Sequence, residues 1–152
     1  MLLQAWWKKT GIMPGTKMFF DNLFTSIPLL KHLALRGISG TGTMRQNRLS
    51  SIPIHSKKVV DKQDRGSTCE VHTDVVSLVG WRDSRAVFMA SNSFTNPLDK
   101  FTFVHRYDRT ARATISVPCP LMVTEYNKGM GGVDLLDRMV SYYVATIRKR
   151  KW

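Results

Sequence analysis

The sequence predicts an α/β fold, and its order of strand-like and helical segments supports this. Residues 17–20 form a short apolar run that is typical of a strand, residues 25–37 show helical spacing, and residues 38–45 are again strand-like. Strand, helix and strand in this order indicate a parallel βαβ unit, because parallel strands need a crossover connection. A β-rich stretch and a second helical pattern follow, so we expect mixed α/β architecture throughout.

The helix predicted between residues 25 and 37 carries signals at both ends. Thr25 or Ser26 can accept a hydrogen bond from its first free N–H groups, and Pro28 is tolerated in the first turn. Gly37 is expected to end the helix, because glycine adopts the left-handed conformation at low cost. The two strands of the βαβ unit therefore flank a well-delimited helix.

The middle of the chain is expected to be β-rich. Residues 45–67 are polar and basic without periodicity, which favours a loop. Residues 68–81 and 85–92 are rich in β-branched and aromatic side chains and predict a hairpin or a small sheet. Residues 93–120, with prolines on both sides of Cys119, have an irregular pattern and no predicted element.

After Pro120 the pattern becomes helical and carries two aspartates. An apolar stripe recurs at 3,4,3,4 spacing, formed by Val133, Leu136, Val140, Tyr143 and Ile147. Asp134 and Asp137 are three residues apart, so on a helix they lie about 60° apart on one face. Such a pair needs a cationic neighbour, for which a divalent metal ion, an arginine and the positive helix N-terminus are the candidates. Asp21, at the end of the first predicted strand, either caps the next helix or supplies a further metal ligand.

The chain is strongly basic, with a formal net charge of +12 over 152 residues. This favours a polyanionic partner, with nucleic acid ahead of an anionic membrane surface, although any single basic run can be only a solvated face. No apolar run has the length of a membrane-spanning helix, and nothing indicates a small-molecule substrate. The two cysteines have no zinc-ligand spacing and read as free thiols, with a disulfide left open. The candidate DNA-binding residues are Arg45, Arg48, Lys57, Lys58, Arg148, Lys149, Arg150 and Lys151.

Two motifs give the chain a family resemblance. The segments "FFDNLFTSIPLL" and "YNKGMGGVDLLDRM", with "GWRDSRAV" between them, resemble the piggyBac transposase family and its transposable element-derived relatives. The resemblance implies a DDE transposase with an RNase H-like core that is interrupted by a β-rich insertion. It also implies a nuclear location, DNA as a partner and dimerisation with transposase relatives.

The resemblance implies a catalytic role for three aspartates. Asp21 corresponds to the second catalytic carboxylate of the family, Asp134 to the third, and Asp137 to a further important acid of the same motif. Together they would bind two Mg²⁺ ions, which drive strand nicking at transposon ends and joining to TTAA targets. The family's first catalytic aspartate precedes the "FDN" motif, whereas Asp21 is the first acidic residue of this sequence.

We therefore expect an incomplete catalytic core that is inactive and retains DNA binding. The expected divisions are a divergent segment at 1–14, the first part of the core at 15–48, the insertion at 49–120 and the catalytic-core helix with its basic tail at 121–152. Two alternatives stay open. One is a module that pairs with an intact transposase relative, and the other is an Mg²⁺-dependent nuclease in which another acid replaces the first carboxylate, from among Asp74, Asp83, Asp99 and Asp108.

Overall fold

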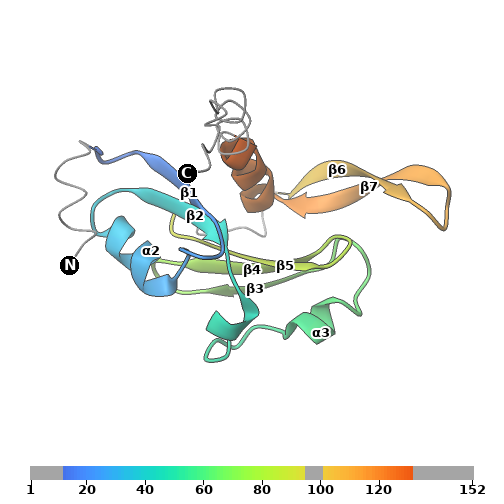
Figure 1. The fold of residues 1–152 in the computed structure, drawn as a ribbon, viewed down its shortest axis with the longest axis horizontal. Helices are drawn as coiled ribbons and strands as arrows, with labels where there is room; N and C mark the ends of the chain where they lie inside the picture. Colours follow the sequence, from blue (N-terminus) through green and yellow to red (C-terminus); the bar gives the residue numbers. More distant parts are fainter. Residues whose placement is uncertain (1–11, 95–100, 132–152) are drawn as a thin grey trace, which may run out of the picture.

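The computed structural model describes residues 12–94 and 101–131, which form a five-stranded mixed sheet, a separate two-stranded ribbon and helices on both faces of the sheet (Figure 1). This confirms the α/β class. No helix in the described ranges is long and apolar enough to cross a membrane. The strands of the sheet follow the order β1 (Lys17–Phe20), β2 (Ser39–Thr43), β5 (Ala86–Ser91), β4 (Ser77–Arg82) and β3 (Thr68–His72).

The predicted βαβ unit is confirmed. β1 and β2 are parallel and in register from Lys17 opposite Ser39 to Phe20 opposite Gly42, and helix α2 (Ile27–Ala34) connects them. Of the two candidate caps, Ser26 is the one used: its hydroxyl oxygen accepts a hydrogen bond from the Leu29 N–H at 3.4 Å. Gly37 follows the helix with a φ of +67°, where a side chain would be strained.

The predicted hairpin or small sheet is also confirmed, and it extends the sheet of the βαβ unit. Residues 68–81 hold two strands, β3 and β4, so the unit has three antiparallel strands with β5. β5 pairs antiparallel with β2, and β4 and β3 continue outward from it. Asn92, just after β5, fastens this junction: its side-chain oxygen accepts from the Gly40 N–H, and its amide group donates to the carbonyl oxygens of Leu30 and Ile38. The predicted loop at 45–67 contains two short turns of helix, η1 (Gln46–Arg48) and α3 (Lys57–Val60).

The interpretation of residues 93–120 as irregular was wrong for most of that stretch. β6 (Phe101–Asp108) and β7 (Ala113–Pro120) form a regular antiparallel ribbon that projects from the sheet (Figure 1). Exposure alternates with a period of two along β6, so the strand signal was present in the order of its side chains. The prolines of β7 are tolerated because a strand in a two-stranded ribbon has one edge without ladder hydrogen bonds.

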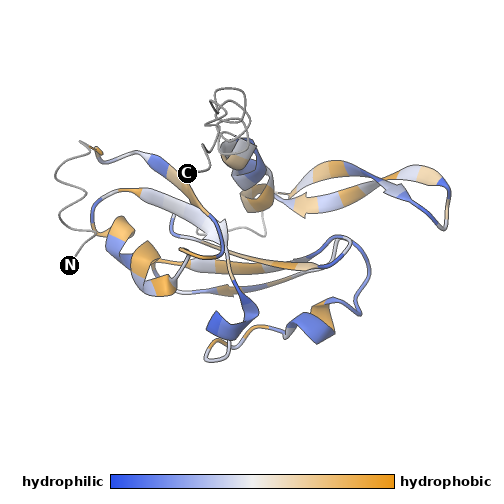
Figure 2. Cartoon of the chain, in the orientation of Figure 1, coloured by the Kyte–Doolittle hydropathy of each residue, from blue (hydrophilic) through white to orange (hydrophobic). Residues whose placement is uncertain are grey.

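Both faces of the central strands are buried, each in its own apolar cluster (Figure 2). On one face Leu78 and Phe88 pack with Leu30 and Leu33 of α2. On the other face a second helix, residues 121–131, covers the sheet together with the base of the ribbon. This second cluster is formed by Val79, Trp81, Met89, Val117, Cys119, Met122, Val123 and Tyr126. Both cysteines are free, as predicted, and burial raises the pKa of both thiols.

The helix at 121–131 includes the first two glycines of the "KGMGG" cluster. An added Cβ at Gly129 would lie 2.1 Å from Cδ2 of Phe19 in β1, so the helix can approach the strand this closely only because position 129 has no side chain. At Gly131 no described atom lies within 4 Å of an added Cβ. The apolar stripe predicted from Val133 onward, and Asp134 and Asp137 with it, lies outside the described residues.

These two glycines form a matched pair for a stability measurement. We expect Gly129→Ala to lower the free energy of unfolding by about 1–3 kcal/mol, because the methyl group overlaps the Phe19 ring. Gly131→Ala should raise it by up to about 1 kcal/mol through helix propensity alone. Urea unfolding followed by circular dichroism measures both. Equal effects of the two substitutions would contradict the packing argument.

Candidate nucleic-acid interface

The loop after β1 presents Asp21 at the carboxyl end of a parallel strand. The Asp21 carbonyl oxygen accepts hydrogen bonds from the backbone N–H groups of Phe24 and Thr25 at 3.0 and 3.1 Å and from the Thr25 hydroxyl at 3.0 Å. Thr25 is fully buried beside Gly42, where an added Cβ would lie 2.2 Å from its hydroxyl oxygen. The "FDN-F-TS" motif therefore builds the turn that holds the Asp21 backbone in place.

Arg48 holds the same loop through hydrogen bonds to its backbone carbonyl groups. Its guanidinium group donates to the carbonyl oxygens of Asn22 at 3.3 Å and Leu23 at 2.9 Å, and also to that of Thr25. Arg45 donates from Nε to the side-chain oxygen of Asn22 at 2.9 Å. The structure thus brings both predicted DNA-binding arginines to the Asp21 loop and gives them partners there, which charge alone did not predict. Their contact with phosphate stays a prediction.

Tyr126, from the helix at 121–131, completes the surroundings of Asp21. Its ring meets the Phe19 ring edge-on, with 6.2 Å between the ring centroids. Burial raises the pKa of the Tyr126 hydroxyl, a hydrogen bond with the Thr43 side chain opposes this rise, and the negative charge of Asp21 adds to it. Sequence reasoning did not single out Tyr126, although it opens the "YNKGMGGVD" motif.

The described part of the chain does not by itself form a metal site. The Asp21 carboxylate has no hydrogen bond or ion pair with a described residue, and a carboxylate oxygen is a ligand that suits Mg²⁺. No group of three His, Cys, Asp or Glu residues within the described ranges is placed to hold a metal ion. Asp134 and Asp137 lie outside these ranges, so their place relative to Asp21 stays a prediction.

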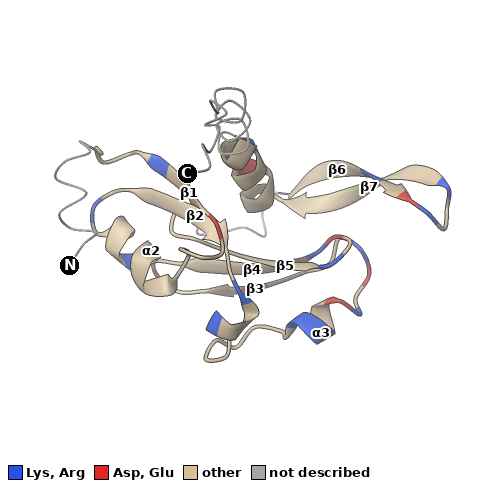
Figure 3. Ribbon diagram, in the orientation of Figure 1, with Lys and Arg blue, Asp and Glu red and all other residues tan. Residues whose placement is uncertain are grey.

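A surface depression of about 370 Å³ lies beside this loop and is lined by cationic and neutral residues. Arg45 and Lys57 contribute cationic side chains and Asn22 and Gln46 neutral polar ones, and none of the described residues that line it is acidic. Lysine and arginine are visible on η1 and α3, which flank it (Figure 3). The predicted residue Lys58 is exposed on α3, whereas the basic tail Arg148–Lys151 lies outside the described residues.

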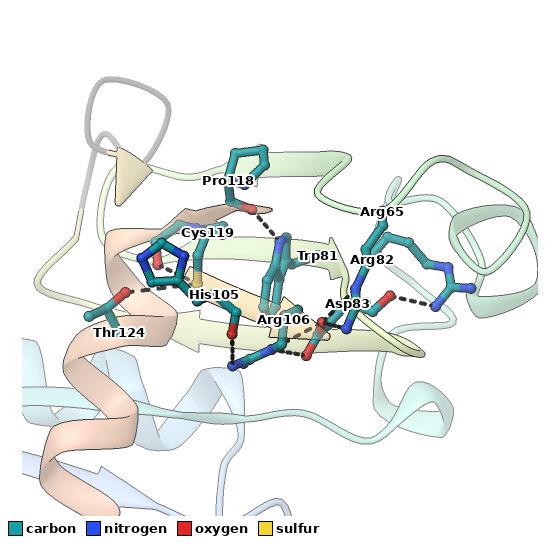
Figure 4. A network of polar contacts seen from close by, with 10 residues as sticks. Arg65, Trp81, Arg82, Asp83, His105, Arg106, Pro118, Cys119 and Thr124 are labelled. Carbon is teal, nitrogen blue, oxygen red and sulfur yellow. Dashed lines mark hydrogen bonds and ion pairs between the residues drawn. The ribbon is translucent and has the colours of Figure 1, made fainter. Parts of the chain in front are cut away.

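Two of the acids considered as replacements for the first carboxylate have structural partners instead. Asp83 accepts hydrogen bonds from Arg65 at 2.8 Å and Arg106 of β6 at 3.1 Å, and thereby ties the ribbon to the β4–β5 turn (Figure 4). Asp108 accepts from the backbone N–H groups of Thr110 and Ala111 in the ribbon turn, and these bonds lower the pKa of its carboxyl group. Asp74 is exposed, and Asp99 lies outside the described residues.

The fold and these motifs match a class of DDE transposases. A DDE transposase family model described as Transposase IS4 matches residues 4–152. The chain belongs to the piggyBac transposase family within this class. It is 36% identical over 147 residues to the human piggyBac transposable element-derived protein 3 and 30% identical over 147 residues to the human piggyBac transposable element-derived protein 2.

A solved structure shows the same fold. The chain matches a piggyBac transposase, solved by cryo-EM as a synaptic complex with hairpin DNA, with a TM-score of 0.61 and 25% identity over 92% of this chain. The match covers 27% of that transposase, and the alignments cover 94–95% of this chain but only 24% of each of the two human relatives. The chain therefore corresponds to about a quarter of these proteins.

The contacts of Arg48 predict a local effect on the Asp21 loop. We expect Arg48→Ala to lower the free energy of unfolding by about 1–2 kcal/mol, since several loop carbonyl groups lose a charged donor, and to accelerate amide exchange at Phe24 and Thr25. Arg48→Lys should recover only part of both losses, because lysine lacks the planar fork. Arg45→Ala, which removes one side-chain contact, serves as the control. Unchanged exchange in Arg48→Ala would contradict this role.

Proposed function

We propose that these 152 residues bind DNA as part of a transposase-derived catalytic core and do not cleave DNA by themselves. The observation that supports DNA binding is the depression beside Asp21, whose lining among the described residues includes two cationic side chains and no acidic one. A net charge of +12 supplies the long-range attraction for a polyanion. A nuclear location and pairing with transposase relatives belong to the same proposal.

The similarity to a transposase whose structure was solved with DNA supports the proposed DNA binding. That relative is captured in a synaptic complex with hairpin DNA. In the present chain, the carboxyl ends of the parallel strands β1 and β2 meet beside the depression, which is where α/β sheets commonly bind ligands. We interpret the βαβ unit and the helix after Pro120 as parts of an RNase H-like core.

The proposed lack of cleavage rests on the acids of the sequence itself. In the family pattern Asp21, Asp134 and Asp137 are inherited carboxylates, and an earlier acid completes the set. Residues 1–20 contain no Asp or Glu, so these 152 residues include no acid ahead of Asp21. Bound Mg²⁺ would neutralise charge on the scissile phosphate, and Asp21 is the described residue that offers it a ligand. Loss of one member of a catalytic set typically reduces the rate by orders of magnitude.

DNA binding through the depression predicts a specific salt dependence. We expect the chain to bind duplex DNA at low salt and to weaken steeply as salt is added, because phosphate contacts release counterions. Lys57→Gln with Lys58→Gln should weaken binding and reduce the slope of log Kd against log salt by about 2. Lys17→Gln with Lys31→Gln removes the same charge elsewhere and should leave the slope nearly unchanged. Fluorescence anisotropy measures all three proteins, and equal slopes would place the contacts outside α3.

Nicking of supercoiled plasmid tests the second half of the proposal. We expect no Mg²⁺- or Mn²⁺-dependent nicking by the chain, because the carboxylate set is incomplete. Asp134→Ala is the control: nicking by the unmodified chain that disappears in this variant would contradict the proposal and establish the metal-dependent nuclease alternative.

A further inference from the structure

The two faces of the β6–β7 ribbon differ in the kind of apolar side chain they carry. The inward face places Val104, Ile115, Val117 and Cys119 in or against the second apolar cluster. The outward positions of β6 are all rings: Phe101, Phe103, His105 and Tyr107. Phe103 is 69% exposed and Tyr107 is 63% exposed, so two large aromatic side chains are accessible to solvent.

The composition of the outward face favours a ligand with planar groups over a protein interface. The β-branched aliphatic side chains of the ribbon lie on the inward face. On the outward face, the Phe101 and Phe103 rings lie opposite two prolines, Pro120 and Pro118. Nearer the turn, the His105 and Tyr107 rings lie opposite the hydroxyl groups of Ser116 and Thr114. Successive outward side chains on a strand lie about 6.5–7 Å apart. This is about twice the 3.4 Å rise per nucleotide, so one unpaired base fits between two successive rings.

The charge near these rings is positive. The turn that follows β6 contains Arg109, two residues after Tyr107, and Arg112, and both arginines are exposed. Figure 3 shows basic residues at this end of the ribbon. The carboxylate of Asp108 in this turn accepts hydrogen bonds from two backbone N–H groups, whereas neither arginine of the turn has a hydrogen bond or ion pair with a described residue. The turn therefore offers cations for a phosphate backbone that runs along the rings.

The ribbon is held firmly enough to present a fixed surface. The indole N–H of Trp81 donates to the Pro118 carbonyl oxygen at 2.9 Å, and Asp83 holds Arg106 from the sheet side (Figure 4). The Thr102 and Thr124 hydroxyl groups, 2.6 Å apart, join the ribbon to the helix at 121–131. Such anchoring keeps the outward rings from folding back onto the sheet.

We infer that the outward face of the β6–β7 ribbon binds single-stranded DNA, with its rings stacking on unpaired bases and the arginines of the turn contacting phosphates. This inference rests on the proposed function, because it adds to a DNA-binding chain a second binding surface that takes single-stranded DNA. Stacking requires bases that are not paired, so the ribbon discriminates single strands from duplex. The duplex-binding depression beside Asp21 involves none of the ribbon residues.

Anisotropy with a labelled oligothymidylate of about 16 nucleotides and with a hairpin duplex tests this inference. Phe103→Ala with Tyr107→Ala should weaken binding to the single strand at least about tenfold and leave duplex binding unchanged, because stacking is lost while the exposed positions cost the fold little. Phe103→Tyr with Tyr107→Phe keeps both rings and should bind as the unmodified chain does. Leu35→Ala controls for the loss of any exposed apolar side chain, because Leu35 follows the last residue of α2 and is 87% exposed.

The remaining outcomes separate the two proposals. Unchanged single-strand affinity in the double alanine variant overturns the ribbon assignment and leaves duplex binding through the depression standing. Equal weakening for single strand and duplex also overturns it, because stacking would then not be the cause. Sedimentation that shows a dimer abolished by the same variant, with no change in DNA affinity, assigns the face to a second copy instead. Absence of binding to both DNAs at low salt overturns the proposed function itself.

Discussion

The close approach of the helix at 121–131 to strand β1 is the constraint on which the rest of the arrangement depends. Gly129 lies against the Phe19 ring with no room for a side chain, and this brings Tyr126 next to Phe19, Thr43 and the charge of Asp21. Because β7 leads directly into this helix, the same contact also fixes where the ribbon leaves the sheet. One packing contact thus sets the positions of the candidate site and of the projecting ribbon.

The Asp21 loop shows how charge-based reasoning and geometry can assign different partners to the same residue. Arg45 and Arg48 were predicted to contact phosphate because they lie in a basic segment, and the structure gives both of them partners in the loop that follows β1. A guanidinium group has five N–H donors, so an arginine that holds carbonyl oxygens can still face a polyanion. Positioning of the loop and attraction of DNA are therefore compatible functions of the same two side chains.

The sequence predicted local features better than long-range ones. The βαβ unit was readable because Ser26, Pro28 and Gly37 mark the helix ends and the apolar spacing is regular. The pairing of β5 with β2 joins residues about fifty positions apart and left no local signal. The ribbon was missed because its alternation on β6 is between rings and polar or aliphatic side chains, with a charged turn and prolines that resemble a loop. The fixing of the Asp21 loop by Arg48 depends on tertiary geometry that no spacing reveals.

The two inferred DNA contacts have different physical origins, and this determines how they can cooperate. The depression beside Asp21 offers point charges, whose attraction falls steeply with salt, whereas exposed rings offer stacking, which depends on unpaired bases and much less on salt. Two such surfaces on one chain act on one DNA molecule only when duplex and single strand are adjacent in it, because each surface then raises the effective concentration at the other. If both inferences hold, a junction between duplex and single strand is the DNA that the depression and the ribbon can bind at the same time.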